Sequence, residues 1–179
     1  MLYIIVALKA EAQAFVDKFS LNKFSLNKFT CFQNENITLI VSGIGINNAM
    51  HATQTLINYY DISDEDTYLN LGICGACKDF SIGEIIDIGS IEYQKRIYTL
   101  QSDSSHMITC VDHEINHNEY KIVDMESFGF YEAVSHSPAI KKHKIIKVVS
   151  DHFEPDIITK EYTKSLIFNT ISIVKKLIS

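Results

Sequence analysis

The order of apolar and amphipathic segments constrains the fold of this chain more than any other feature of its sequence. Short apolar runs rich in β-branched residues, typical of buried strands, alternate with stretches whose apolar residues recur at helical spacing. We expect strands at 2–8, 37–45, 67–77, 82–93 (as one or two segments), 106–112 and 143–153, and helices at 9–19, 46–60, 124–137 and 159–178. This alternation predicts an α/β fold: a three-layer α/β/α sandwich with a central mixed, mostly parallel sheet.

Length and composition fit one domain and exclude several classes of protein. The chain has 179 residues, and no segment rich in proline or glycine divides it, so we predict a single domain over residues 1–179. With 46% hydrophobic and 21% charged residues, the composition is that of a globular protein. A formal charge of −6 without a basic cluster argues against nucleic acid and against a membrane surface as partners.

The N-terminal segment and the cysteines predict a cytoplasmic protein. The stretch "MLYIIVALKAEAQAF" has no basic leader and no cleavage site, and its apolar run is too short to span a bilayer. The four cysteines of a chain without a signal peptide are expected to be reduced thiols.

Three acids are candidates for the functional site. Two of them lie at or just beyond the carboxyl ends of expected strands, where open α/β sheets gather functional residues, and the third lies in an apolar segment. Glu11 follows the first strand, Asp151 ends the strand at 143–153, and Glu126 stands in the largely apolar stretch "KIVDMESFGFYEAV" (121–134). Acids are rarely buried without a partner or a role. Taken singly, Glu11 could be a solvated acid of a helix's first turn and Asp151 a cap or turn residue, and Asp124 is expected to cap its helix.

Several other motifs have plainer explanations. The stretch "SGIGINNA" (42–49) lacks the third glycine and the acid of a dinucleotide-binding fingerprint, and it predicts a tight strand-to-helix turn. The "CGAC" motif (74–77) has the spacing of a redox pair, but no clear helix follows it, and Cys31 and Cys110 do not complete a zinc site. The seven histidines form no metal-binding pattern. The tandem FSLNK repeat within 19–29 is expected to be a duplication in a surface connection.

Five stretches together resemble the nucleoside phosphorylase and nucleosidase superfamily, most closely the nucleosidases that cleave methylthioadenosine and S-adenosylhomocysteine. They occur in the family's order, span nearly the whole chain, and read "VALKAEA" (6–12), "SGIGINNA" (42–49), "NLGICGAC" with "IGEIIDI" (70–88), "VDMESFG" (123–129) and "VVSDHFEP" (148–155). Each motif alone is weak, whereas the acid-Met-Glu motif with a late Ser-Asp is fairly specific. The resemblance implies a phosphorylase/hydrolase-like fold, no metal or organic cofactor, and a homodimer in which a loop of one subunit completes the other's site.

The resemblance also implies roles for single residues. Glu11 matches the glutamate that orders or deprotonates the attacking water, and Asp151 matches the aspartate that protonates N7 of the purine. Glu126 matches the glutamate that binds the ribose hydroxyls, and Met125 matches the methionine packed on the sugar. Asp151 and Glu11 are thus the expected catalytic residues, and the expected substrate-binding residues are Glu126, Met125, Ile73, Gly75 and His113.

The sequence departs from the family in the residues that surround the substrate. Members of well over 200 residues carry further loops and a helix where this chain has only the stretch from about Tyr93 to His106. Ile73 replaces a serine, and the purine-stacking phenylalanine has no match, His113 being the candidate substitute. These departures leave the nucleoside open among methylthioadenosine, adenosylhomocysteine, futalosine, deoxyadenosine and a larger adenosyl lipid.

The expected chemistry is hydrolysis of the N-glycosidic bond of an adenosine-type purine nucleoside. The leaving purine needs a proton, the cationic sugar needs a nearby negative charge, and a water must be aimed at the anomeric carbon. Phosphorylases of the superfamily bind phosphate through arginines and a glycine-rich loop after the first strand, but this loop reads "ALKAEA" and Arg96 is the only arginine. We therefore predict a hydrolase, with a phosphate-dependent phosphorylase and a non-catalytic nucleoside-binding or redox protein as alternatives.

Overall fold

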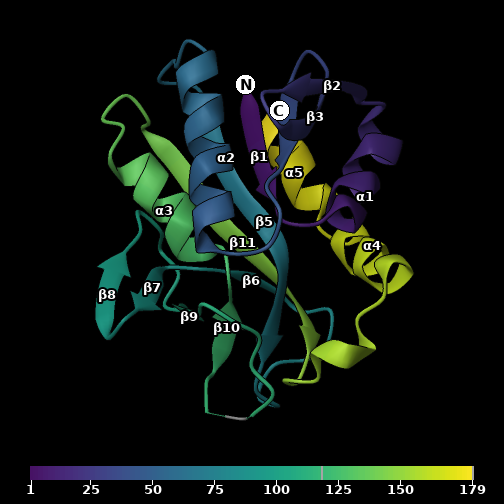
Figure 1. The fold of residues 1–179 in the computed structure, drawn as a ribbon, viewed down its shortest axis with the longest axis vertical. Coiled ribbons are helices and arrows are strands. Elements are labelled where there is room, and N and C mark those ends of the chain that lie inside the picture. Colours follow the sequence, from purple (N-terminus) through teal and green to yellow (C-terminus); the bar gives the residue numbers. More distant parts are fainter. Residues whose placement is uncertain (118, 179) are drawn as a thin grey trace.

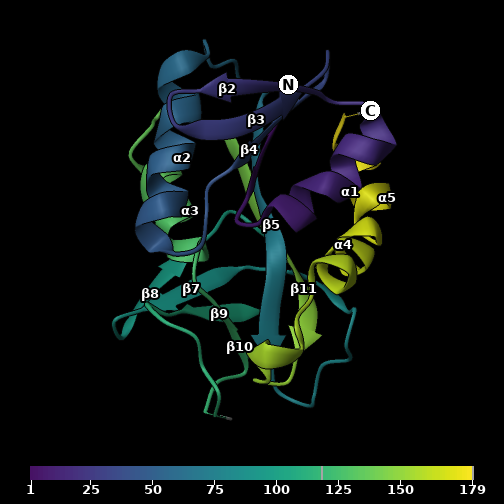
Figure 2. The same ribbon diagram turned by 45° about the vertical axis from the view of Figure 1, so that its right-hand side comes forward.

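The structure, a computed structural model, describes residues 1–117 and 119–178 and places a mixed sheet between two layers of helices. Helices α2 and α3 cover one face, and α1, α4 and α5 cover the other (Figure 1, Figure 2). The helices are α1 (Lys9–Phe19), α2 (Ile46–Tyr59), α3 (Ser127–Ser135), the 3₁₀ helix η1 (Pro155–Ile157), α4 (Lys160–Phe168) and α5 (Ile171–Ile178). The strands are β1 (Leu2–Val6), β2 (Asn22–Leu26), β3 (Phe29–Gln33), β4 (Ile37–Val41), β5 (Thr67–Ala76), β6 (Ile85–Asp87), β7 (Ser90–Tyr93), β8 (Arg96–Thr99), β9 (Met107–Cys110), β10 (Ile122–Asp124) and β11 (Lys142–Asp151).

The centre of the sheet is parallel, and antiparallel pairing is found toward its edges. β5 pairs in parallel with β1 along one edge and with β11 along the other, and β1 pairs in parallel with β4. The antiparallel hairpin β2–β3 extends the sheet beyond β4, while β10, β9, β7 and β8 extend it past the end of β5. The predicted α/β class, with helices on both faces of a mixed sheet, is confirmed.

The long strand β5 changes its neighbour partway along one edge. β1 pairs with Thr67–Asn70, whereas β10 pairs only with Gly75 and Ala76. Within the described ranges, no strand pairs with residues 71–74 on that edge, because β1 has ended and β10 has not begun. Backbone groups of β5 in this interval are therefore available to side chains, and the sheet opens at the carboxyl end of β1.

Alternating side chains of the strands form two cores, one on each face of the sheet. In β1, Tyr3 and Ile5 pack on the side of α2 and α3, whereas Leu2, Ile4 and Val6 pack on the side of α1, α4 and α5. All five side chains are at most 3% exposed. The continuous apolar run of this strand follows from burial on both faces, as in other parallel sheets.

Close packing between the first turns of α2 and α3 positions one side of the functional site. Gly129 of α3 lies so close to the carbonyl oxygen of Ile46 that a Cβ atom at position 129 would overlap it. Glycine permits this approach because it has no Cβ. The contact brings Glu126, which precedes α3, beside Gly45, which precedes α2.

Some elements differ from the sequence-based expectation. The FSLNK repeat is more than a plain connection, because it supplies β2 and the turn of the edge hairpin β2–β3. The buried Leu26 and Phe29 flank this turn, and Asn27 lies in it at φ 52°. Asparagine tolerates this left-handed conformation better than most residues. The expected helix at 159–178 is divided into α4 and α5 where the Thr170 hydroxyl binds the Ile167 carbonyl, a bond that competes with the helix. The short strands β8 and β10 were not predicted.

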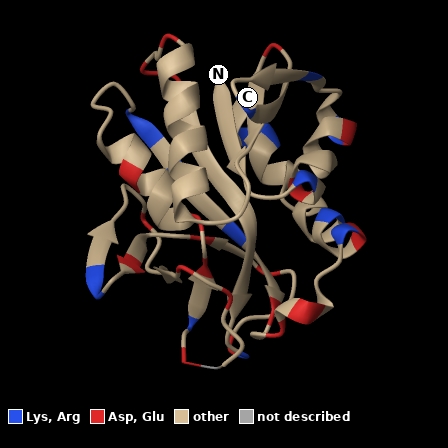
Figure 3. Cartoon of the chain, in the orientation of Figure 1, with Lys and Arg blue, Asp and Glu red and all other residues tan. Residues whose placement is uncertain are grey.

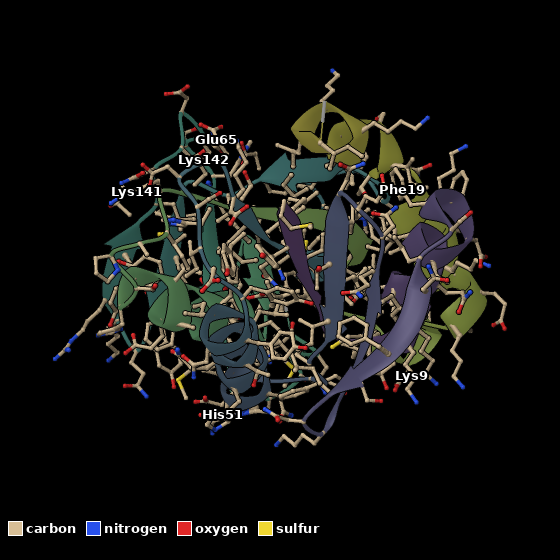
Figure 4. All side chains as sticks on the ribbon, turned by 90° about the horizontal axis from the view of Figure 1, so that it is seen from above. Lys9, Phe19, His51, Glu65, Lys141 and Lys142 are labelled. Carbon is tan, nitrogen blue, oxygen red and sulfur yellow. The ribbon has the colours of Figure 1, made fainter. Side chains whose placement is uncertain are left out.

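Most charged residues are exposed or half-buried. Lysines and the arginine are spread over several elements of the fold (Figure 3). One exposed ion pair joins Lys142 Nζ to Glu65 Oε2 at 2.8 Å, and both residues lie at one border of the molecule in Figure 4. In the described part of the chain, no helix has both the length and the apolar composition that crossing a membrane requires.

Candidate active site

A cavity of about 270 Å³ opens where β1, β10 and β11 end, beside the gap in the pairing of β5. Glu114 and Asp124 are part of its wall. The wall also includes five residues that the sequence predicted for the site: Glu11, Ile73, Met125, Glu126 and Asp151. A larger hollow of about 750 Å³ lies against β7 and β9 and contains none of the predicted residues. The smaller cavity is therefore the candidate active site.

Glu11 is a buried carboxylate that three backbone N–H groups hold in place. Oε2 accepts hydrogen bonds from Ala7 (2.9 Å) and Leu8 (2.8 Å), and Oε1 accepts one from Ile73 (3.0 Å), in the unpaired interval of β5. Gly72 provides the space, because a Cβ atom at that position would lie 2.8 Å from Oε1. Burial raises the pKa of Glu11, although these N–H groups favour its ionised form.

Glu126 is a second buried carboxylate, 8% exposed, on the opposite side of the gap. Its Oε1 accepts a hydrogen bond of 2.9 Å from the backbone N–H of Gly45, whose φ of 103° is open to glycine and strained for other residues. Burial raises the pKa of Glu126 to about 7; the Lys147 ammonium opposes the rise and the Asp124 carboxylate adds to it. Near neutral pH this carboxyl group can therefore change its protonation state.

Asp151 is the third buried acid, 6% exposed, at the end of β11. Oδ2 accepts a hydrogen bond from the Ser150 hydroxyl (2.6 Å), and Oδ1 accepts one from the Glu154 N–H (2.9 Å). The register of β11 against β5 shifts between Val149 and Asp151, and irregularities of this kind re-aim side chains. Each carboxylate oxygen has room for more than one hydrogen bond, so a ligand can still bind to Asp151.

Lys147, which sequence reasoning did not single out, is the buried cation beside these acids. Its Nζ lies 2.7 Å from Asp124 Oδ2, and both side chains are 1% exposed. Asp124 also accepts hydrogen bonds from the N–H (2.9 Å) and hydroxyl (2.6 Å) of Ser127. Burial alone lowers the pKa of Lys147, but the Asp124, Glu126 and Glu11 carboxylates more than reverse this effect, so the ammonium stays charged.

The expected capping role of Asp124 needs a correction. α3 begins at Ser127, the cap position belongs to Glu126, and Asp124 is the last residue of β10. From the end of the strand, Asp124 still accepts a hydrogen bond from the first N–H group of the helix. It also pairs with the buried ammonium of Lys147. A lysine within the apolar strand sequence "KIIKVVSD" was the signal that could have revealed this partner.

Two residues predicted to bind substrate do not line the cavity. Gly75 lies just behind the wall, where a Cβ atom would come within 3.6 Å of both Asp151 Oδ1 and a ring carbon of Phe153. His113 is exposed, and its neighbour Glu114 takes the place at the wall.

The alternative sites find less support in the structure. Burial raises the pKa of the Cys74 thiol, which makes a reactive Cys74–Cys77 pair unfavourable near neutral pH. Arg96 is exposed on β8 and does not line the cavity. Among residues 1–117 and 119–178, no group of three or more His, Cys, Asp or Glu side chains is arranged to hold a metal ion.

Solved structures resemble this chain although its sequence matches no protein-family model and no curated protein. The 5′-methylthioadenosine/S-adenosylhomocysteine nucleosidase of Neisseria meningitidis, in complex with methylthio-immucillin-A, is 18% identical with a TM-score of 0.81, over 98% of this chain and 97% of that chain. The 5′-methylthioadenosine nucleosidase of Arabidopsis thaliana is 17% identical with a TM-score of 0.81, over 99% and 93% of the two chains.

A third similar structure is the futalosine hydrolase of Helicobacter pylori, which is 12% identical with a TM-score of 0.79, over 98% of this chain and 96% of that chain. All three are nucleosidases or nucleoside hydrolases by name, and the alignments include nearly the full length of both chains. The agreement extends across both helical layers and the sheet between them. The chain therefore has the same fold as these nucleosidases and the futalosine hydrolase.

Proposed function

We propose that this chain is a purine nucleoside N-ribohydrolase that cleaves the N-glycosidic bond of an adenosine-type nucleoside. The observation that carries the proposal is that three buried carboxylates from separate elements, Glu11, Glu126 and Asp151, line one cavity. The similar structures support it, since they include a methylthioadenosine nucleosidase and a futalosine hydrolase, and one of them binds an immucillin analogue.

Two of the acids act on the two fragments of the substrate in this proposal. Asp151 delivers a proton to the leaving purine, and the hydrogen bonds from Ser150 and Glu154 hold its carboxyl group in one orientation. Glu126 accepts hydrogen bonds from the ribose hydroxyls, and its ionised form stabilises the positive charge that develops on the sugar. That charge favours the ionised state of Glu126, which burial alone disfavours.

Glu11 orients and deprotonates the attacking water. Its three N–H donors hold both carboxylate oxygens: Oε2 accepts two hydrogen bonds, whereas Oε1 accepts one and keeps a lone pair for the attacking water. The raised pKa makes this carboxylate a better proton acceptor than an exposed glutamate. A positioned general base of this kind contributes a rate factor of about 10²–10⁴.

Water is favoured over phosphate as the nucleophile. The N–H groups of Ala7, Leu8 and Ile73 are donors of the kind that bind phosphate, but Glu11 already occupies them. A phosphate ion in this position would meet a carboxylate instead of an arginine, which is the natural bidentate ligand for phosphate. The position of Glu11 thus supports hydrolysis over phosphorolysis.

A chromatographic assay tests the proposal. Purified protein is incubated with methylthioadenosine, adenosylhomocysteine, adenosine, inosine and futalosine, each with and without phosphate, and free base is measured. Release that does not depend on phosphate is the expected result and names the substrate. Release only with phosphate would identify a phosphorylase, and binding of adenine without any release would identify a non-catalytic nucleoside-binding protein.

Two isosteric variants test the assigned residues. Asp151→Asn and Glu126→Gln should each lower kcat/KM by about 10²–10⁴-fold, because each removes a charge or a proton that the reaction needs. Glu35→Gln, at an exposed site in the turn before β4, is the matched control and should leave turnover unchanged. Unaltered thermal unfolding midpoints would show that the fold persists, and near-wild-type turnover in a site variant would remove that residue from the mechanism.

The proposal extends to the setting of the enzyme. The family resemblance implies a homodimer that acts on a small purine nucleoside without a metal or organic cofactor. The N-terminal segment and the cysteines suggest a cytoplasmic protein, and the acidic charge argues against nucleic acid or a membrane surface as a partner. Light scattering behind size-exclusion chromatography measures the oligomeric state directly. A monomer with full activity would contradict a site that is completed by the second subunit.

A further inference from the structure

The candidate cavity is negative toward anything that enters it. Among the described residues, no lysine, arginine or histidine lines it, whereas the acids in its wall are Glu11, Glu114, Asp124, Glu126 and Asp151. The buried ammonium of Lys147 is already paired with Asp124. Clefts lined by one sign of charge concentrate ligands of the opposite sign and repel ligands of the same sign. The wall therefore acts on every charge of a substrate, including charges remote from the bond that breaks.

Glu114 differs from the other acids of the cavity. Each of the other four accepts at least one hydrogen bond from a backbone N–H group. Glu114 lies in the coil after β9 with an exposed side chain, and within the described part of the chain it makes no hydrogen bond or ion pair. Its carboxylate is available to a bound ligand, and the proposed hydrolysis gives it no task. A residue with these properties can contribute to substrate specificity.

We propose that Glu114 makes this site select nucleosides whose substituent away from the scissile bond is uncharged or cationic, and reject those that carry phosphate or carboxylate there. This inference rests on the proposed function, whose substrate class it narrows. An amine in this substituent can form an ion pair with Glu114. The affinity for a nucleoside with an uncharged thioether there is neither raised nor lowered by the Glu114 carboxylate. A phosphate or carboxylate meets an unneutralised acid, and no basic side chain of the described wall offsets the repulsion.

The test uses three adenine nucleosides that differ mainly in the charge of the 5′ group: 5′-amino-5′-deoxyadenosine, adenosine and adenosine 5′-monophosphate. Release of adenine gives kcat and KM, and titration calorimetry gives Kd independently of turnover. Each is measured for wild type, Glu114→Gln and the matched control Glu35→Gln, at low and at high salt. Because Glu114 is exposed and the replacement is isosteric, the fold should persist, and thermal unfolding checks this.

For wild type we expect kcat/KM with the monophosphate to be at least about tenfold below that with adenosine, since no basic side chain of the described wall offsets the charge of Glu114. Glu114→Gln should narrow the ratio of kcat/KM between the amine and the monophosphate by about two- to fivefold, through KM and Kd. Glu35→Gln should not change the ratio. High salt should narrow it in wild type, because it screens exposed charges.

The two proposals fail in different ways. Equal handling of adenosine and its monophosphate by wild type, or equal shifts in Glu114→Gln and Glu35→Gln, would overturn the role of Glu114 whether or not base is released. Absence of base release together with the expected order of Kd values would reject the hydrolase and support the charge selection.

Discussion

Two lysines of β11 form ion pairs of almost equal length in opposite surroundings. Lys142 Nζ lies 2.8 Å from Glu65, and the two side chains are 50% and 86% exposed. Lys147 Nζ lies 2.7 Å from Asp124, and both side chains are 1% exposed. The first pair competes with water and salt, so its loss should cost little. In the buried pair, water cannot solvate the charge that remains when one partner is lost. Burial, and not the distance between the charges, therefore decides how much stability is lost when each pair is broken.

The buried pair also has a reason to exist that the exposed pair lacks. A pair of well-packed apolar side chains at these positions would often be as stable or more stable, because desolvating two charges is costly. The Lys147 ammonium, however, also opposes the rise that burial causes in the pKa values of Glu11 and Glu126. We infer that the ammonium is retained because the carboxylates of the site need a positive charge nearby.

The largest expected effect is the loss of the buried cation. Lys147→Met should lower the free energy of unfolding by about 3–5 kcal/mol, because it leaves Asp124 buried without its counter-charge. Urea denaturation monitored by circular dichroism measures the change. Lys147→Arg keeps the charge and should recover part of the loss. If Lys147→Met destabilises no more than Lys142→Met, the distinction between the two regions is wrong.

Crowding the space beside Glu11 should act on stability and activity together. In Gly72→Ala the new Cβ would lie 2.8 Å from Glu11 Oε1, so the carboxylate must shift. We expect a loss of about 1–3 kcal/mol of stability, as for other overpacked sites, and about a 10²-fold loss in kcat from misplacing the base. Gly83→Ala is the control, since Gly83 has φ 84° and lies near Leu166. It should destabilise the fold while kcat stays at its wild-type value.

The pH dependence of stability should reveal the burial of Glu126. Burial raises its pKa from 4.5 to about 7, so between these pH values the folded state holds a proton that the unfolded state has released. Stability from this group is therefore present below about pH 4.5 and is lost as pH rises to about 7. Urea titrations across this range should show a shallower decline in Glu126→Gln than in wild type. Parallel curves would contradict the raised pKa.

The smallest effect belongs to the exposed pair. Lys142→Met should change the free energy of unfolding by no more than about 1 kcal/mol, because Glu65 remains solvated without its partner. The difference should shrink further at high salt, which already screens the wild-type pair. If Lys142→Met lowered the free energy of unfolding by much more than this, and by the same amount at high salt, the pair would not be the solvent-screened contact described here.

Sequence patterns predicted much of the architecture because they depend on local geometry. The runs 2–8 and 67–77 are mostly apolar because β1 and β5 are covered on both faces, and this pattern places them in the sheet without further information. β10 was missed because its three residues are too few for a periodicity. Its last residue, Asp124, was assigned to the following helix, so the start of α3 was placed too early.

Prediction of the site was less complete. Glu11, Glu126 and Asp151 were singled out by motif order, and the structure brings them to one cavity. His113 was proposed and its neighbour Glu114 was not considered, because adjacent residues of an irregular coil carry no periodic signal for the direction of their side chains. Coil geometry depends on what packs against it, so a motif alone does not choose between neighbours.

Local pattern alone was enough to establish the α/β layering, the order of the elements and the acids that follow them, because backbone periodicity and strand ends are properties of short segments. Only the tertiary structure showed what those acids bind. Glu11 meets the N–H of Ile73 across 62 positions of sequence, and Glu126 meets Gly45 across 81. Lys147 reaches Asp124 from a different strand. Such pairings depend on where β1 ends and β10 begins along β5, and sheet register is set by the packing of the whole domain.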